Sequence, residues 1–258
     1  MLTDIVIRSV IAGLLASVAC GLGVLPLAFK QIDLAKHRGI GYGIAGGMMF
    51  AASVYNLILP GLNHADATLQ LVDVLPVLGG ILLGAGVMSM ADRLLETPKL
   101  DGDTTVDIDA RRATWLLLIG MTIHSIPEGV AVGVGFTSGE IHQTELGEYI
   151  ALAIGIHNIP EGLAVGLVLR LAGYRLHSCF WLATLTSLPQ PIAAVPAVLV
   201  SWLFRPLMPL LLGFAAGAMI FLIILELIPD AMQTESPKKT AWSFTFGFCL
   251  MMLIQVIL

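Results

Sequence analysis

Charged residues are scarce in this 258-residue chain, and the scarcity limits the class of protein it can be. Asp, Glu, Lys and Arg make up 12% of the residues, against roughly 25% in a typical soluble domain, while 57% are hydrophobic. A soluble fold of this length could not bury so much apolar surface, and the mean hydropathy is +0.91. A basic patch suited to nucleic acid is absent. The composition therefore predicts a protein whose solvent is the lipid bilayer.

Cysteine is rare, and a common zinc-protease motif is missing. Cys20, Cys179 and Cys249 stand alone within apolar segments, where a free thiol behaves as a small hydrophobic side chain. They therefore predict neither a disulfide framework nor a thiolate metal site. An H-E-x-x-H sequence, which would place two zinc ligands and a general base on one helix, does not occur.

Apolar runs near the ~20 residues that cross the hydrocarbon core recur along the whole sequence. The eight predicted membrane helices cover residues 5–29, 40–62, 71–92, 113–137, 147–170, 178–203, 207–231 and 241–258. The first lacks a basic leader and is longer than the apolar core of a signal peptide, so we expect it to be retained. Because the connections are short, we expect a single transmembrane domain over residues 1–258, with a polar cytoplasmic loop at about 96–112.

The basic residues predict how the helices are oriented. Four connections, which follow the first, third, fifth and seventh helices, carry most of them: Lys30, Lys36, Arg38, Arg93, Lys99, Arg111, Arg112, Arg170, Arg175, Lys238 and Lys239. Only Arg8 and Arg205 fall on the other side. Cytoplasmic loops are enriched in Lys and Arg, so these four connections are predicted to be cytoplasmic and both termini to lie outside.

Acidic and amide residues mark the predicted outer side. The connection between the fourth and fifth helices carries several ionisable groups but no Lys or Arg: Glu140, His142, Glu145 and Glu148. We expect either an ordinary solvated loop or an acidic funnel that concentrates cations. Asn56 and Asn63 on the second helix either line an outer pathway or form hydrogen bonds at the helix end.

A weak internal repeat links the second and seventh predicted helices. Ala45-Gly-Gly-Met-Met49 precedes Leu59-Pro60, and Ala215-Ala-Gly-Ala-Met219 precedes Ile228-Pro229. Chance can produce so short a match, but transporters are often built from repeats that flank a central site. We therefore expect an all-α membrane protein of eight transmembrane helices, with helices 1–3 and 6–8 as inverted repeats around the central 4–5 pair.

Two near-identical hexapeptides interrupt the apolar pattern 33 residues apart, His124-Ser-Ile-Pro-Glu128-Gly129 and His157-Asn-Ile-Pro-Glu161-Gly162. Each places a His and a Glu on one face of a helix. Ionisable side chains at membrane depth are costly and mark functional sites. A lone His there could simply form an interhelical hydrogen bond, but a duplicated pair favours a metal site. If the two helices pack antiparallel, two imidazoles and two carboxylates converge on a divalent cation such as Zn²⁺.

The proline and glycine of each hexapeptide have predictable effects. Pro127 and Pro160 cannot donate to the carbonyls of Ile123 and Ile156, so we expect kinked helices and carbonyls that line a cavity. The glycine that follows each Glu would let another helix backbone approach closely.

At these residues the chain resembles the ZIP (Zrt-, Irt-like) metal transporter family, and the likeness covers essentially the whole chain. Shared traits are eight helices with external termini, paired H-x-x-P-E-G motifs on helices 4 and 5, and a variable cytoplasmic loop between helices 3 and 4. Its compact loops are similar to those of bacterial members. The resemblance implies import of a divalent metal across a bacterial inner membrane, through an elevator-like movement. It also implies a transport site made by helices 2, 4, 5 and 6.

On the matching positions, the resemblance implies that His124, Glu128 and Glu161 are metal ligands. His157 occupies a variable ligand position and suits zinc. Met49 matches a position where related bacterial members place a thioether near the metal, although core packing explains it equally well.

The resemblance also concerns a second ion, which some members bind beside the first. The matching positions here are Ser125, Asn158 and Gln190, which are neutral, so we expect one principal ion and an absent or weak second site. Acidic residues near Glu226 and Asp92 line an exit route or a peripheral site in the family. Asp92 could instead pair with Arg93 or Arg112 at the membrane boundary.

The sequence thus predicts a Zn²⁺ importer whose metal is a substrate rather than a cofactor. Alternatives are a broad-range importer of Fe²⁺, Mn²⁺, Co²⁺ or Cd²⁺, an intramembrane metallohydrolase and a metal sensor. The hydrolase is disfavoured because no second general base accompanies the motifs, and the sensor because no signalling domain is evident. The expected partners are the metal ion and the bilayer, and a homodimer is compatible with the sequence.

Overall fold

A computed structural model describes residues 2–28, 34–62, 71–95, 105–142 and 145–257, which are almost entirely helical and contain no strand. The elements are α1 (Leu2–Leu22), η1 (Leu25–Ala28), α2 (Leu34–Ala52), η2 (Ser53–Ile58), α3 (Leu59–Leu62), α4 (Leu71–Leu95), α5 (Thr105–His142), α6 (Leu146–Leu171), α7 (Leu176–Thr186), α8 (Pro189–Leu199), α9 (Ser201–Phe204), η3 (Arg205–Leu207), α10 (Met208–Leu222), η4 (Ile223–Leu227), α11 (Ile228–Thr234) and α12 (Pro237–Ile257).

Most of the chain is suited to a bilayer. Among the described residues, seven helical segments are long and apolar enough to cross a membrane, and they coincide with the first seven predicted spans. The eighth prediction corresponds to α12, a 21-residue helix that is not among those seven. The all-α membrane fold is therefore confirmed, while the inverted-repeat arrangement remains a prediction.

Two predicted boundaries were wrong. The polar segment at 96–112 is not wholly a loop, because α5 already begins at Thr105; residues 96–104, like Asn63, lie outside the described part. The predicted helix 178–203 is broken into α7 and α8 at Ser187 and Leu188. Proline has no backbone N–H to continue a helix, but it is tolerated in the first turn of one. One helix therefore ends at Thr186, and the next begins at Pro189.

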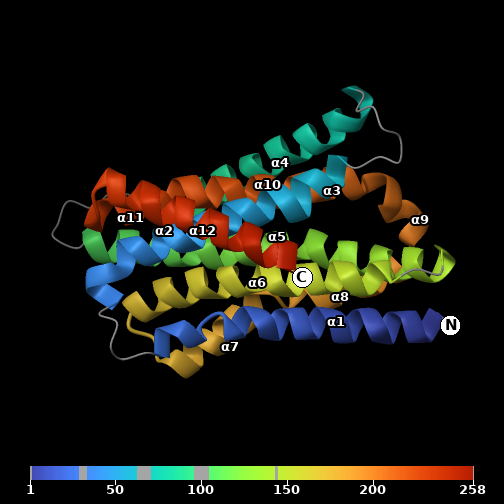
Figure 1. Cartoon of the computed structure of the whole chain (residues 1–258), viewed down its shortest axis with the longest axis horizontal. Coiled ribbons are helices and arrows are strands. Elements are labelled where there is room, and N and C mark those ends of the chain that lie inside the picture. Colours follow the sequence, from blue (N-terminus) through green and yellow to red (C-terminus); the bar gives the residue numbers. More distant parts are fainter. Residues whose placement is uncertain (1, 29–33, 63–70, 96–104, 143–144, 258) are drawn as a thin grey trace.

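The helices form two sets that lie side by side (Figure 1). The motif set contains α1, α5, α6, α7 and α8, and the flanking set contains α2, η2, α3, α4, α10, η4, α11 and α12. Within the motif set α1 packs on α6 and α5 on α8; within the flanking set α4 packs on α10 and α2 on α12. The two sets meet mainly through α5 with α10 and α6 with α2.

Glycines make the contacts inside each set much closer than those between the sets. A Cβ at Gly162 would collide with the carbonyl of Cys20 on α1, and one at Gly84 with the carbonyl of Phe214 on α10. Gly41, which faces the other set, instead meets the methyl end of Leu167. Backbone-to-backbone contact locks helices together, whereas flexible side-chain ends can rearrange.

The two proline segments of the weak sequence repeat share an unusual local structure. A π-helix precedes the proline in each: the Leu59 N–H donates to the carbonyl of Val54, and the Ile228 N–H donates to that of Ile223. Such wide turns often occur at functional sites. The second and seventh predicted spans therefore share a local irregularity as well as a short motif.

The predicted acidic outer end includes a cation from a distant part of the chain. Arg8 of α1 forms ion pairs with Glu148 of α6 and, at 3.7 Å, with Glu140 of α5. The guanidinium also lies 5.4 Å from the ring centroid of Phe136. The guanidinium of Arg8 therefore offsets part of the negative charge of Glu140 and Glu148.

Candidate metal centre

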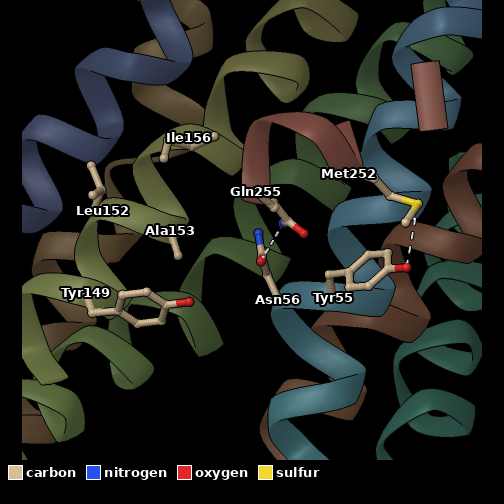
Figure 2. A pocket seen from close by; sticks show the side chains of 8 residues that line it. All are labelled: Tyr55, Asn56, Tyr149, Leu152, Ala153, Ile156, Met252 and Gln255. Carbon is tan, nitrogen blue, oxygen red and sulfur yellow. Dashed lines mark hydrogen bonds between the residues drawn. The ribbon is translucent and has the colours of Figure 1, made fainter. Parts of the chain in front are cut away.

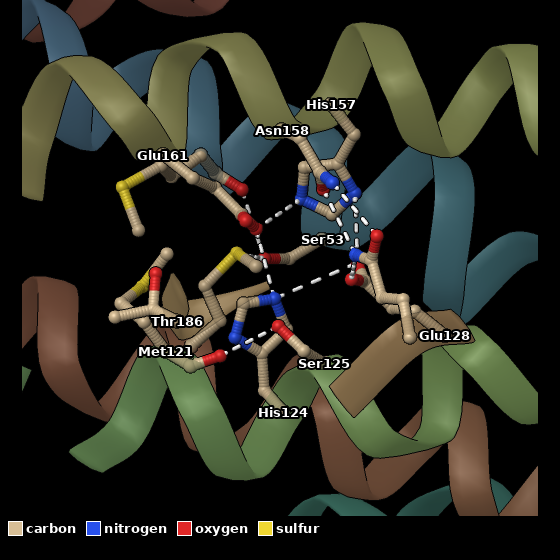
Figure 3. A network of polar contacts seen from close by, with 12 residues as sticks. Ser53, Met121, His124, Ser125, Glu128, His157, Asn158, Glu161 and Thr186 are labelled. Atoms are coloured by element: carbon tan, nitrogen blue, oxygen red, sulfur yellow. Dashed lines mark hydrogen bonds and ion pairs between the residues drawn. The ribbon is translucent and has the colours of Figure 1, made fainter. Parts of the chain in front are cut away.

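The two hexapeptides face each other from α5 and α6, which run in opposite directions in the bundle (Figure 1). His124 and Glu128 project from α5, and His157 and Glu161 project from α6 into the same space (Figure 3). All four residues have 0% exposure. The predicted convergence of two imidazoles with two carboxylates is therefore present in the structure.

Each carboxylate contacts both imidazoles. Oε1 of Glu161 lies 2.8 Å from Nε2 of His124 and 3.1 Å from Nε2 of His157. Oε1 of Glu128 lies 3.5 Å from Nε2 of His124 and 3.4 Å from Nδ1 of His157. The four side chains thus form one cluster rather than two separate His–Glu pairs.

These contacts are ion pairs if the imidazoles are protonated, and they do not satisfy the hydrogen-bonding groups involved. Seven of the eight side-chain nitrogens and carboxylate oxygens have no hydrogen-bond partner among the described residues: both nitrogens of His124 and His157, both oxygens of Glu161, and Oε1 of Glu128. Buried polar atoms normally find partners, and several unsatisfied atoms gathered together suit a missing ion. Donor atoms that point at a shared space rather than at one another are what a metal site requires.

The size of the cluster supports the same conclusion. Ligand atoms of His124, Glu128 and Glu161 all lie within 4.8 Å of one another. His157 falls outside that mutual distance because the two imidazole centroids are 6.3 Å apart. We nevertheless include it, since its nitrogens approach both carboxylates. Imidazole nitrogen and carboxylate oxygen are ligands for Zn²⁺ and related transition metals, and two ionised glutamates would neutralise a divalent charge.

The three neutral residues beside the motifs have distinct contacts. The Ser125 hydroxyl donates to the carbonyl of Met121 in its own helix at 2.7 Å. Asn158 donates to the backbone carbonyl of Ala16 on α1 at 2.8 Å. Gln190 of α8 places its side-chain N–H, not its oxygen, 2.5 Å from Glu128 Oε2. The Ser125 hydroxyl therefore bonds its own helix, whereas Gln190 contacts the cluster as a donor.

Two buried methionines of the flanking set, Met49 and Met219, lie beside Ser53. Met49 is fully buried, in a cluster that also contains Met219. The Ser53 hydroxyl lies within hydrogen-bond distance of the Met49 carbonyl, at 2.8 Å, and of Met219 Sδ, at 2.9 Å. Figure 3 shows Ser53 beside the imidazoles. Ser53 was not predicted, although its position one helical turn after Met49 places both on the same face.

The two remaining candidates lie elsewhere. Glu226 is half-buried in η4, and Asp92 is half-buried near the end of α4. Neither belongs to the group of mutually close ligands found among the described residues. Their predicted roles on an exit route are therefore separate from the central cluster.

A pocket with both polar and apolar lining lies between the two sets (Figure 2). Its volume is about 240 Å³. It is lined by Tyr55, Asn56, Tyr149, Leu152, Ala153, Ile156, Met252 and Gln255. Gln255 donates to Asn56 at 2.6 Å, and the Tyr55 hydroxyl lies 3.6 Å from the sulfur of Met252. Ala153 lies one turn before His157 on α6, so the pocket lies on the N-terminal side of the cluster along this helix.

The glycine of each motif allows the close packing that was predicted. A Cβ at Gly129 would collide with the backbone of Gln190 on α8, as one at Gly162 would with Cys20 on α1. These contacts fix the rotation of α5 and α6. The local structure that aims the four ligand side chains inward therefore depends on the residue after each Glu.

Known proteins are similar in sequence to this chain over most of its length. The family described as ZIP Zinc transporter matches residues 96–255. Zinc transporter GufA of Myxococcus xanthus is 33% identical over 253 residues, covering 95% of this chain and 97% of that protein. Zinc transporter ZIPB of Bordetella bronchiseptica is 32% identical over 253 residues, covering 97% of this chain and 81% of that protein. A longer relative from Arabidopsis thaliana is 37% identical over 235 residues, and the chain spans 36% of its length.

Proposed function

We propose that this chain, which belongs to the ZIP zinc transporter family, carries a divalent metal ion across a membrane, with Zn²⁺ as its preferred substrate. The observation that carries the proposal is the fully buried cluster of His124, Glu128, His157 and Glu161, most of whose polar atoms lack hydrogen-bond partners. Because the cluster lies at the middle of apolar helices, an ion bound there is inside the membrane rather than at its surface.

In this proposal the four motif side chains hold the ion and Met49 approaches it from the flanking set. Two imidazoles and two carboxylates form a nitrogen–oxygen ligand set that favours zinc but also accepts Fe²⁺, Mn²⁺, Co²⁺ and Cd²⁺. The metal is cargo, so the protein is not an enzyme. A hydrolase reading is weaker because each carboxylate already contacts both imidazoles and is needed as a ligand.

The pocket between the sets supplies an entrance. Its amides and phenols can contact the water shell of a cation, and its position next to His157 leads towards the cluster. The charge pattern places this end of α6 outside the cell, so the ion would move from outside to the cytoplasm. The bacterial relatives support a place in the cell membrane of a bacterium, with both termini outside.

The division into two helix sets supports a sliding movement of one set against the other. The motif set holds all four ligand side chains, and its helices are locked together by glycine contacts. The flanking set meets it through flexible side-chain ends, as Gly41 meets Leu167. We infer that the motif set slides as a unit against the flanking set and carries the ion with it.

Purified protein in liposomes that contain a fluorescent zinc indicator tests the proposal directly. Addition of Zn²⁺ outside should produce saturable uptake that exceeds that of empty liposomes. Competition by Fe²⁺, Mn²⁺, Co²⁺ and Cd²⁺ would rank the substrates, and an imposed pH gradient would show whether protons are coupled. Protein that binds Zn²⁺ but moves none would contradict transport, and metal-dependent hydrolysis of a lipid or peptide by the same protein would favour an enzyme.

A further inference from the structure

One ligand-type atom of the cluster differs from the other seven. Oε2 of Glu128 accepts a hydrogen bond from Nε2 of Gln190 at 2.5 Å, whereas Oε1 of the same carboxylate faces the imidazoles without a hydrogen-bond partner. Gln190 comes from α8 and is fully buried. The two oxygens of Glu128 are therefore in chemically different environments.

A second amide holds Gln190 in place. Nδ2 of Asn158 lies 3.0 Å from Oε1 of Gln190, and Nε2 of Gln190 lies 3.2 Å from Oδ1 of Asn158, so the two amides pair reciprocally. Each amide nitrogen has one further hydrogen, which Asn158 donates to the Ala16 carbonyl and Gln190 donates to Glu128. All four N–H groups of the pair are used.

The orientation of both amides follows from their outer partners. A backbone carbonyl can only accept hydrogen bonds, so Asn158 must present its nitrogen to Ala16. The reciprocal pairing of the two amides then turns the remaining N–H of Gln190 towards Glu128. Turning either amide over would place two oxygens against each other. The pair is thus a rigid link from the backbone of α1, through α6 and α8, to a carboxylate on α5.

This link restricts what Glu128 can bind. An N–H donor carries positive charge on its hydrogen, so a cation cannot occupy the same side of Oε2. The hydrogen bond uses one lone pair of Oε2, whereas Oε1 faces the imidazoles without a hydrogen-bond partner and is the oxygen best placed for an ion held there. A second cation on the Gln190 side of the carboxylate would meet the positive end of the N–H dipole, which disfavours it.

We propose that Gln190, held by Asn158, is a positioning residue that fixes Glu128 with one oxygen towards the transported ion and limits the centre to a single ion. The inference rests on the proposed transport function. It assigns the neutral amides a task other than weak metal ligation, because they act through Glu128 and do not contact the ion.

Zinc binding to the full chain in detergent, measured by equilibrium dialysis, tests the limit on ion number. Wild-type protein should bind one Zn²⁺ per chain. Gln190→Glu removes both donor hydrogens and adds an acceptor next to Glu128 Oε2, so it should bind two. Two ions in the wild type, or one in a well-folded Gln190→Glu variant, would overturn the proposal.

Uptake kinetics test the positioning role. Gln190→Met keeps the side-chain size but cannot donate, so the KM for Zn²⁺ should rise roughly tenfold or more while the maximal rate changes little. Asn158→Leu should have the same effect, and the double variant should be no worse than either single one. Thr186→Val is the control, because the Thr186 hydroxyl is buried nearby but donates to its own helix at the Ala183 carbonyl.

The results distinguish a failure of the proposed transport function from a failure of the positioning role alone. Wild-type protein that neither binds nor transports zinc contradicts the proposed function itself. Wild-type transport together with an unchanged KM in Gln190→Met and Asn158→Leu contradicts only the positioning role. Gel filtration and thermal unfolding of each variant show whether it folds, and the two apolar variants decide the matter if Gln190→Glu does not fold.

Discussion

Nε2 of His124 on α5 lies 2.8 Å from Oε1 of Glu161 on α6, closer than the 3.5 Å that separates it from Glu128 in its own motif. The two hexapeptides therefore interlock across the helix pair. An ion held here would be shared between the helices, and neither motif would suffice alone.

Glu161→Ala should abolish saturable zinc uptake. The carboxylate contacts both imidazoles and would supply one of the two negative charges that offset a divalent ion. Its loss should therefore weaken zinc binding by more than the roughly 10–100-fold that removal of a ligand's hydrogen-bond partner costs. Uptake into liposomes is the measurement. Glu145→Ala, at the exposed N-cap position just before the same helix, should leave uptake unchanged. Near-wild-type flux in Glu161→Ala would refute the ligand assignment.

Zinc should stabilise the folded protein through the cluster. A ligand at about 100 times its Kd stabilises the native state by about 2.7 kcal/mol, so the Tm in detergent should rise with zinc concentration. His124→Ala should lose this rise. Ca²⁺ is a matched control, since it prefers all-oxygen sites and should raise the Tm little. An equal rise in His124→Ala would place zinc binding elsewhere.

Filling the pocket between the two helix sets should slow entry without destroying the cluster. Ala153 lines the pocket, and Ala153→Phe would occupy part of its volume of about 240 Å³. The maximal uptake rate should fall severalfold, while zinc binding by dialysis stays at wild-type stoichiometry. Leu82→Phe on α4, where the side chain is 74% exposed, is the control. Unimpaired uptake by Ala153→Phe would indicate another entrance.

Tethering the two helix sets should stop transport. In a chain with Cys20, Cys179 and Cys249 replaced by Ala, Gly41→Cys with Leu167→Cys joins α2 to α6, whose atoms are in contact there. A bifunctional thiol reagent should inhibit uptake by this variant, and a reductant should restore it if the reagent forms disulfides. Gly46→Cys with Ile223→Cys joins neighbouring segments of the flanking set only. Its uptake should survive cross-linking; equal inhibition of both would contradict sliding.

Gly162→Ala should destabilise the bundle. The added methyl would collide with the Cys20 carbonyl, and overpacking of this kind costs about 1–3 kcal/mol. The Tm in detergent should fall. Gly86→Ala is the matched control, because nothing lies within 4 Å of a Cβ there and alanine favours a helix. A Tm fall of the same size in Gly86→Ala would argue against the collision.

Local sequence patterns were enough to predict the helices and the His–Glu pair of each hexapeptide. Long apolar runs specify membrane helices because each residue is solvated by lipid wherever it lies, and a His and a Glu four residues apart share a helix face in any fold. Breaks were harder to predict. The apolar run at 178–203 hides the end of α7, where two prolines remove the hydrogen bonds that would continue it.

Contacts between distant segments could not be predicted in this way. Arg8 and Glu148 are 140 residues apart, and the Gln190–Glu128 hydrogen bond spans 62. The sequence singled out Gln190 as a neutral residue at a ligand position, but only its surroundings determine whether it offers an oxygen or a hydrogen. Ser53 was missed for the same reason, since a serine in an apolar helix usually bonds its own backbone.

The sequence by itself determined the membrane helices, the four candidate ligand side chains and the close approach at each motif glycine, because these depend on hydropathy and helical period alone. The tertiary structure decided which His meets which Glu, and which oxygen of Glu128 remains for an ion. That choice depends on the rotation of α5 and α6 about their axes and on an amide pair supplied by α6 and α8. Rotations and partners of this kind are set by packing between segments far apart in the chain.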